Sequence, residues 1–365
     1  MKESGKSATL DLDNMLLLDA LQLAPRASWS RIGEVLGITA VTAAKRWARL
    51  REGGIAWVTA APAMAVRTAQ CLAYVEITCH PEHRYTVANA IAQHRLAVSV
   101  ELTTGGADIL VSVAAADWQT MSHYLLAHLD QVEHVLSSRA RIATRIYGEG
   151  SAWRLREMPA AAARALERVS AECATGRATG GPLRVTDRMR TMLVRLSVDG
   201  RASVTDIAEC SGLNPTTARR RLVELLNSGI VMVRTDVASR AVGWPVQVYF
   251  AANAPVAMLN ETAQALSRFR ESRLTATVTG GPNLTFCAWL RTIEEVHRLE
   301  MAIAARLPHV EIVDRLIVLR TIKRMGRLID EQGRAVDVVP IDMWDDSLPH
   351  VRVMRGTSFA ALASP

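Results

Sequence analysis

The sequence predicts an α+β protein in which one unit of two domains occurs twice. Residues 26–55 and residues 201–230 share the same order of helix caps, turns and stops, 175 positions apart. A Thr-Gly-Gly turn that begins at Thr104 returns at Thr279 with the same separation. Solenoid repeats have periods of roughly 20 to 50 residues. A repeat of this length therefore indicates a duplicated domain pair.

Composition narrows the class of protein. At 365 residues, with 49% hydrophobic and 22% charged residues, the chain has the composition of a globular protein of several domains. The net charge of +7 favours a polyanionic partner without specifying which kind. Five scattered cysteines, with no C-x-x-C pair, indicate neither a disulfide framework nor a zinc site, so we expect a cytoplasmic protein. The longest uncharged run, 241–260, is interrupted by Gly and Pro, and we expect no membrane segment.

The first unit of each half is predicted to form three helices with a tight turn between the last two. In the first copy Ser28 is a good N-cap, Gly37 supplies a left-handed turn residue, and a third helix runs from Thr39 to about Glu52. In the second copy Ser203 is the N-cap of the second helix and Gly212 is the turn residue. Asn214 is the N-cap of the third helix, and Gly229 ends that helix. Such a turn presents the following helix to the DNA major groove. Each unit is therefore predicted to be a winged or three-helix helix-turn-helix domain.

The third helix of each unit has a core face and an exposed face. The predicted core positions are Ala43, Trp47 and Leu50, matched by Ala218, Leu222 and Leu225. The predicted DNA-binding residues are Thr39, Val41, Thr42, Ala44, Lys45, Arg46 and Arg49, and Asn214, Thr216, Thr217, Arg219, Arg220 and Arg221. The second copy is better supplied, because Arg219 and Arg220 reach guanine edges or phosphates. Arg46 and Arg221 lie near the boundary of the core face, where pairing with a local carboxylate competes with contact to DNA. The alternative is that both units are packing modules with solvated arginines.

The second unit of each half is predicted to follow the ferredoxin-like order strand, helix, strand, strand, helix, strand. In the first half the predicted elements are 72–78, 85–94, 98–103, 108–114, 118–129 and 135–146. In the second half they are 246–251, 256–270, 274–279, 284–290, 294–306 and 311–323. The predicted division of the chain is 1–62 and 183–238 for the DNA-binding domains, 63–147 and 239–326 for the ferredoxin-like domains, 148–182 for a linker and 327–365 for a C-terminal extension. The linker is predicted to hold a helix over about 159–173, and the extension an edge strand at 336–341 or 351–353.

These features together resemble the Lrp/AsnC (feast/famine) family of transcription regulators, here as two fused copies. The resemblance rests on Leu10-Asp11, Arg26-Ala27-Ser28, residues 32–37, residues 42–55 and the Thr-Gly-Gly-Ala-Asp segment at 104–108. It implies that the ferredoxin-like domains pair through their sheets, so one chain forms within itself the dimer that other members build from two chains. It also implies further self-association and a small effector, commonly an amino acid.

The resemblance places effector contacts near the glycine-rich turns. The residues it implies are Gly105, Gly106 and Asp108, and Gly280, Gly281 and Asn283. Asp108 offers a charge for an amino group, whereas Asn283 lacks that charge. The alternative is that the glycines serve only the hairpin turn.

The alternative to a regulator is an enzyme, because the predicted two-domain plan is similar to that of heme-pathway decarboxylases. They would need a His-Asn-Tyr-type stretch and an aromatic cavity, but the chain has His94-Arg95-Leu96 at that place and 5% aromatic residues overall. No catalytic residues, metal site or cofactor motif are identified, and His80 and His83 lack a third ligand. We therefore expect no enzyme and no cofactor.

The predicted function is a sequence-specific DNA-binding transcriptional regulator, gated by a small effector. Its partner would be a double-stranded operator with imperfect two-fold symmetry, because the two recognition helices differ. The alternative is an effector-independent architectural protein that bends or bridges DNA.

Overall fold

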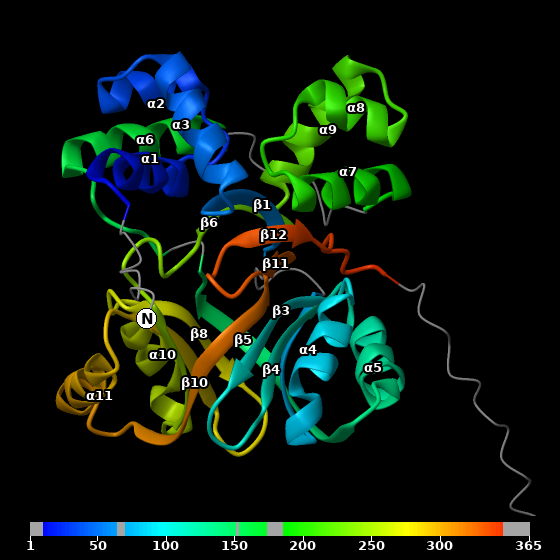
Figure 1. Cartoon of the computed structure of the whole chain (residues 1–365), viewed down its shortest axis with the longest axis vertical. Coiled ribbons are helices and arrows are strands. Elements are labelled where there is room, and N and C mark those ends of the chain that lie inside the picture. Colours follow the sequence, from blue (N-terminus) through cyan, green and yellow to red (C-terminus); the bar gives the residue numbers. More distant parts are fainter. Residues whose placement is uncertain (1–9, 64–69, 151–152, 174–184, 346–365) are drawn as a thin grey trace, which may run out of the picture.

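The computed structural model describes residues 10–63, 70–150, 153–173 and 185–345. Two small helical heads lie above a body of strands covered by helices (Figure 1). Head one consists of α1 (Leu12–Leu23), α2 (Trp29–Leu36) and α3 (Ala40–Glu52), and head two of α7 (Asp187–Val198), α8 (Val204–Ser211) and α9 (Pro215–Asn227). The predicted helix-turn-helix units are therefore present in both halves.

The helix ends follow from the capping residues. Ser28 and Thr39 accept hydrogen bonds from the backbone N–H groups of Arg31 and Thr42, which would otherwise lack intrahelical partners. Gly37 ends α2 with a φ of 68°, a left-handed conformation that favours glycine. Gly212 does the same in head two with a φ of 62°. Each turn is thus set by local sequence.

A two-stranded sheet connects the heads. The strands are β1 (Ala56–Pro62) and β6 (Val231–Val237), and they pair in antiparallel fashion along their whole length. Each strand follows directly from the third helix of its head. The heads are therefore held by a ladder between the two halves of the chain.

The body contains the predicted ferredoxin-like elements from both halves. The first set is β2 (Cys71–Cys79), α4 (Arg84–Ala92), β3 (Ala97–Thr103), β4 (Ile109–Ala115), α5 (Trp118–Ala127) and β5 (Val135–Gly148). The second set is β7 (Val246–Asn253), α10 (Leu259–Ser267), β8 (Ser272–Val278), β9 (Leu284–Leu290), α11 (Glu294–Arg306) and β10 (Glu311–Arg324). Short 3₁₀ turns lie at Pro81–His83, Leu129–Gln131 and Val256–Met258. Both sets repeat the order strand, helix, strand, strand, helix, strand.

The strands of the two sets form one closed ring. Its order is β10-β3-β4-β2-β5-β8-β9-β7, and β7 pairs again with β10. Two long strands make the junctions, since β5 pairs with β2 and β8, and β10 pairs with β3 and β7. Closure leaves no unpaired edge in the ring. The helices α4 and α5 cover one side of the body, and α10 and α11 cover the other (Figure 1).

Three groups of apolar side chains fill the body. One lies under α4 and α5, one under α10 and α11, and one between the inward faces of the two sets of strands. The inner group includes Leu72, Tyr74 and Leu110 from the first half and Tyr249 and Ala276 from the second. The ring interior is therefore a core shared by both halves.

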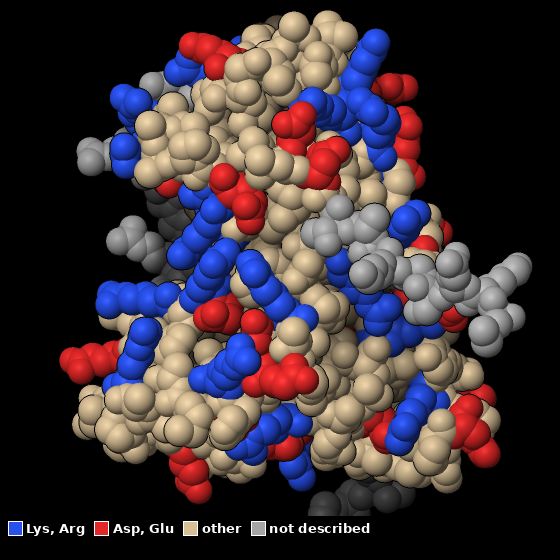
Figure 2. All heavy atoms as spheres, turned by 60° about the vertical axis from the view of Figure 1, so that its left-hand side comes forward, with Lys and Arg blue, Asp and Glu red and all other residues tan. Residues whose placement is uncertain are grey.

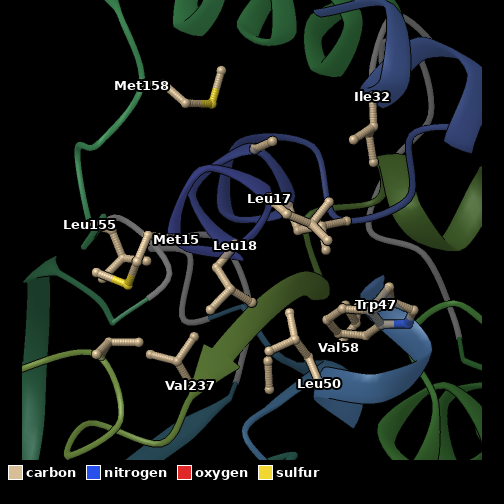
Figure 3. Packing of buried hydrophobic residues seen from close by; sticks show 14 of the residues in the cluster. Met15, Leu17, Leu18, Ile32, Trp47, Leu50, Val58, Leu155, Met158 and Val237 are labelled. Atoms are coloured by element: carbon tan, nitrogen blue, oxygen red, sulfur yellow. The ribbon is translucent and has the colours of Figure 1, made fainter. Parts of the chain in front are cut away.

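The segment predicted as a linker contributes to head one. Its helix α6 (Ala160–Cys173) agrees with the helix predicted at about 159–173, whereas the glycine-rich stretch after it lies outside the described residues. Leu155 and Met158 are buried with Leu17 and Leu18 of α1, as Figure 3 shows. Trp47 and Leu50 of α3 complete the same core. Head one is thus larger than its three helices.

The C-terminal extension forms a hairpin at the edge of β10. Its strands are β11 (Arg327–Ile329) and β12 (Ala335–Val338), the second overlapping the edge strand predicted at 336–341. The alternative stretch at 351–353 lies outside the described residues. The Ala335 N–H donates to the Gly54 carbonyl of head one at 2.8 Å. Asp342 accepts hydrogen bonds from Arg190 of head two at 3.0 Å. The extension therefore touches both heads.

Candidate nucleic-acid interface and central cavity

The recognition helix of head one presents few charged groups. Lys45 and Arg49 are exposed along α3, together with Val41, whose exposed fraction is 62%. Arg46 forms an ion pair with Asp13 at 2.7 Å. Thr39 is the N-cap, and its hydroxyl also contacts the hydroxyl of Thr42 at 2.9 Å, while Ala44 is half-buried. The exposed basic groups of this helix are thus Lys45, Arg49 and Arg51, and Arg51 pairs with Asp199 at 3.6 Å.

The third helix of head two exposes two adjacent arginines. Thr216, Arg219 and Arg220 are exposed along α9. The Asn214 side chain accepts from the Thr217 N–H at 2.8 Å as the N-cap. Arg221 pairs with Glu224 at 2.6 Å, so the boundary arginine of each recognition helix is bound to a carboxylate. The two helices therefore expose different side chains, and the predicted inequality of their DNA contacts stays a prediction.

Charge does not mark the interface by itself. On the face shown in Figure 2, Lys and Arg side chains are interspersed with Asp and Glu. Surface charge of mixed sign gives weak long-range steering. The recognition helices are therefore identified by their position in the helix-turn-helix units.

Two arginines join the heads reciprocally. Arg26 of head one donates hydrogen bonds to the carbonyls of Gly200 and Ala202. Arg201 of head two donates to the carbonyls of Pro25 at 2.5 Å and Ala27 at 2.8 Å. The Arg201 guanidinium also lies 3.9 Å from the ring centre of Trp29. Burial lowers the pKa of Arg201 to about 10 and also lowers the pKa of Arg26.

The glycine-rich turn of the first half packs on the second half. The Thr104 N–H donates to Ile317 at 2.9 Å, and Gly105, with a φ of 88°, lies against β10. Gly106 faces Asp314 across the same contact. Asp108 is already bonded, because it accepts from the Cys79 N–H at 3.0 Å and pairs with Arg84 at 2.6 Å.

The turn of the second half mirrors this arrangement. The Thr279 N–H donates to Ile142 of β5 at 2.9 Å, next to Gly280 and Gly281. Asn283 accepts from the Ala254 N–H at 3.0 Å, in the way that Asp108 accepts from Cys79. Both turns therefore lie at the junction of the halves, and Asp108 and Asn283 fasten them to the neighbouring strand end.

A cavity of about 130 Å³ lies inside the strand ring, on the side of the heads. The part of the cavity wall nearest the heads contains Ala61 of β1 and Met232 of β6, which are paired with each other. Its apolar walls include Leu72, Val98 and Leu274. The cavity is thus bounded by both halves and by the sheet that carries the heads.

Charged side chains line one end of the cavity. They are Arg234, Arg273 and Arg324, with Glu101 and Glu149. Asp236 accepts from Arg234 at 2.7 Å and from Arg273 at 3.1 Å. Arg324 donates to Gln247 at 2.7 Å, and Gln247 donates to Glu101 at 2.7 Å. This is a buried network of charges within a protein core.

Burial and neighbouring charges change the pKa values of this network. Burial lowers the pKa of Arg273 to about 10, partly offset by Asp236. It raises the pKa of Glu101, against the opposing effect of Arg324, and it raises the pKa of the Cys287 thiol. The pKa of Asp236 is lowered by Arg234 and Arg273, which together outweigh its burial. Three guanidinium groups thus lie beside three carboxyl groups, of which Asp236 has its pKa lowered and Glu101 has its pKa raised.

Aromatic rings surround the arginines. The Arg273 guanidinium lies 3.9 Å from the ring centre of Trp289 and 5.0 Å from that of Trp153. Trp289 also donates to Gln247 at 3.2 Å. The sequence analysis missed this cavity, because its residues are far apart in the chain and form no motif. The overall aromatic content of 5% also hides the local concentration of tryptophan.

Among the residues that the structure describes, no cluster of three or more His, Cys, Asp and Glu side chains has the geometry to hold a metal ion. No helix within the described ranges has the length and apolarity needed to span a bilayer.

Two family models match the first half of the chain. An AsnC-type helix-turn-helix domain matches residues 10–51, and a Lrp/AsnC ligand binding domain matches residues 72–153. The comparison with curated proteins gave no match. Residues 10–51 and 72–153 therefore match the domain pair of the Lrp/AsnC family, which confirms the predicted family resemblance and fold class for one copy of the pair and leaves the duplication a prediction.

Solved structures add a likeness over most of the chain. The siroheme decarboxylase NirDL, in co-complex with an iron-uroporphyrin III analogue, is 12% identical and has a TM-score of 0.55. The likeness covers 86% of this chain and 93% of that one. The leucine response regulatory protein LrpA of Mycobacterium tuberculosis is 19% identical over 38% of this chain and 96% of its own, with a TM-score of 0.36. AsnC of E. coli is 14% identical over 37% and 93%, with a TM-score of 0.31.

The likeness to the decarboxylase bears on the expectation that the chain is not an enzyme. The sequence analysis excluded an enzyme, on the absence of a local His-Asn-Tyr stretch and the low aromatic content. That exclusion is wrong, because an enzyme has this fold over nearly the whole chain. A single stretch and an average composition say little about a site that long-range packing assembles.

Proposed function

We propose that this chain, whose first half carries the domain pair of the Lrp/AsnC regulators, is a DNA-binding transcriptional regulator with two unequal heads. The observation that carries the proposal is the pair of capped helix-turn-helix units held together by the β1–β6 ladder. A fixed pair of heads suits an operator of two half-sites. Because α9 exposes Arg219 and Arg220 where α3 exposes Lys45 and Arg49, the half-sites should differ.

The DNA contacts divide into two kinds. Arg219, Arg220 and Thr216 are placed to contact base edges or phosphates in the half-site of head two. Lys45 and Arg49 are placed to contact phosphates in the other half-site. Most of the specificity should therefore come from head two, and head one should add affinity that depends on salt.

The proposed regulation is that an effector at the junction of the halves changes the spacing of the heads. The two glycine-rich turns pack on β10 and β5, the strands that join the halves. A ligand that prefers one arrangement of these strands would change operator affinity by linkage. Asp108→Asn tests the turn, because Asn283 has the same fastening role without a charge. If the effector needs the Asp108 charge, the variant keeps DNA binding and loses its response to amino acids.

The first experiment is recovery of genomic DNA fragments by the purified full-length chain near physiological salt, with and without a pool of amino acids. A few enriched promoter fragments that change with the pool would support the gated regulator. Broad recovery with little sequence preference would favour the architectural alternative. Arg220→Ala is the matched control, since it removes an exposed contact without touching a core.

Catalysis on the same fold is a second candidate. The decarboxylase likeness over 86% of the chain favours it. The reaction would break a carbon–carboxylate bond, release CO₂ and place a proton on the carbon left behind. The test is incubation with siroheme, followed by mass spectrometry for loss of carboxyl groups. An unchanged substrate, with the denatured chain as control, would count against this candidate.

A further inference from the structure

We propose that the central cavity binds a small organic acid, with the carboxylate of the acid beside Arg234, Arg273 and Arg324. The apolar part of the acid would lie between the sheets. The cavity is distinct from the glycine-rich turns and from the recognition helices, so the acid would occupy a site of its own.

The charged residues that line the cavity itself are three arginines and two acids, Glu101 and Glu149. Three arginines line the cavity or its edge, and two carboxylates, Asp236 and Glu101, are buried with them. Glu149, a third acid, is half-buried. Buried charges are normally paired, because removing an ion from water is costly.

Unsatisfied polar atoms also point to a ligand. Within the described residues, neither the Tyr74 hydroxyl nor the Arg234 Nε has a hydrogen-bond partner. Tyr74 is only 4% exposed and lines the cavity. A buried unsatisfied donor is destabilising and rare in folded proteins. Both atoms are donors, and a carboxylate accepts from several donors at once.

The size and walls of the cavity limit the ligand. An engineered cavity of about 150 Å³ holds one benzene molecule, so a cavity of about 130 Å³ suits an acid with a short apolar group. Leu72, Val98 and Leu274 supply apolar contacts for that group.

The available acids argue against an amino acid in this cavity. Asp236 is bonded to two arginines through its Oδ1 atom, and Glu101 accepts from Gln247, whereas the Asp236 Oδ2 atom has no hydrogen-bond partner among the described residues. An ammonium group would compete with these bonds and lie close to three guanidinium groups. The ligand class is therefore a carboxylic acid without an ammonium group.

The site occurs once in the chain, although the ferredoxin-like elements occur twice. The positions 175 residues before Arg273 and Arg324 are Val98 and Glu149, and the position before Trp289 is Ala114. Tyr74 and Tyr249, in contrast, are retained at the same separation. The cationic end is thus built mainly by the second half, and one acid per chain is expected.

The site is connected to the heads. Arg234 belongs to β6, which carries head two and pairs with β1 of head one. Trp153 and Trp289, beside Arg273, are part of the core of head one. A bound acid would therefore stabilise the sheet that sets the spacing of the heads, an effect on DNA that rests on the proposed function.

The test uses the full-length chain with benzoate and isovalerate as probes, and with benzamide and L-leucine as matched non-binders. Isothermal titration should give one site per chain for the acids. A ligand that binds the native state raises the melting temperature, so thermal unfolding provides a second readout. Replacing the carboxylate by the neutral amide should weaken binding about ten- to a hundredfold.

Tyr74→Phe is the decisive variant, because it removes only an unpaired hydroxyl. It should leave the unliganded melting temperature unchanged or raised and weaken benzoate binding about three- to tenfold. Tyr147→Phe, outside the cavity, should leave benzoate binding unchanged. Equal binding of benzoate to both variants, stronger binding of L-leucine than of isovalerate, or no binding of either acid would each overturn the proposal. DNA recovery by the same preparation shows separately whether the proposed function stands.

Discussion

The reciprocal arginines between the heads allow a quantitative prediction. Arg201→Ala removes two charge-assisted hydrogen bonds, to Pro25 and Ala27, and the contact with Trp29. Each such bond contributes about 1.5–3 kcal/mol, and the cation–π contact about 0.5–2 kcal/mol. The burial that lowers the pKa of Arg201 to about 10 offsets part of this gain. The expected loss in the free energy of unfolding is about 2–4 kcal/mol.

The assay is urea unfolding at pH 7, followed by tryptophan fluorescence, because Trp29 and Trp47 report on head one. The first transition should move to lower urea in Arg201→Ala. Arg31→Ala is the control on the same head, since its ion pair with Glu34 is exposed and contributes about 0.5 kcal/mol or less. A change in Arg201→Ala no larger than in this control would refute the reasoning. Affinity for a two-half-site operator should also fall, while affinity for a single half-site stays the same.

Three further predictions concern the recognition helices, the C-terminal hairpin and a buried lysine. Arg220→Ala should weaken specific DNA binding by about 1–3 kcal/mol, and by more than Lys45→Ala does, in fluorescence anisotropy; a larger effect at Lys45 would reverse the ranking of the heads. Gly54→Ala should destabilise the protein by more than the roughly 1 kcal/mol expected for backbone strain alone, because the added Cβ would lie 2.2 Å from the Ala335 carbonyl oxygen. The control is Gly212→Ala, whose added Cβ meets no atom within 4 Å. Equal melting temperatures for the two variants would contradict this prediction. Burial lowers the pKa of Lys323 to about 7. Between about pH 7 and pH 10 the unfolded chain therefore carries one more proton on this side chain than the folded chain does. The free energy of unfolding, relative to that of Lys323→Met, should rise by up to about 1.4 kcal/mol per pH unit over that range. If chemical unfolding gives the same pH dependence for both proteins, Lys323 stays charged in the folded state.

Local features of the fold were predictable from the sequence, and long-range features were not. Ser28, Gly37 and Gly212 determine caps and turns through their own conformations, so the helix-turn-helix units could be placed. The β1–β6 ladder and the second pairing of β10 with β7 join segments far apart in the chain, and no local pattern encodes them.

The candidate site also has a part that could be predicted from the sequence and a part that could not. Exposure of Arg219 and Arg220 followed from helix periodicity, and the carboxylate partners of Arg46 and Arg221 fit their boundary positions. The cavity could not be predicted, because its arginines lie on three separate strands. Only the folded ring brings them together.

The central claim is that one chain presents two unequal heads to one operator. The measurement that tests it most directly is the affinity for a recovered operator and for versions in which each half-site is mutated separately. We expect a footprint over both half-sites, with a loss at least about tenfold larger when the half-site of head two is changed. Equal losses at the two half-sites, or protection of a single one, would contradict the claim.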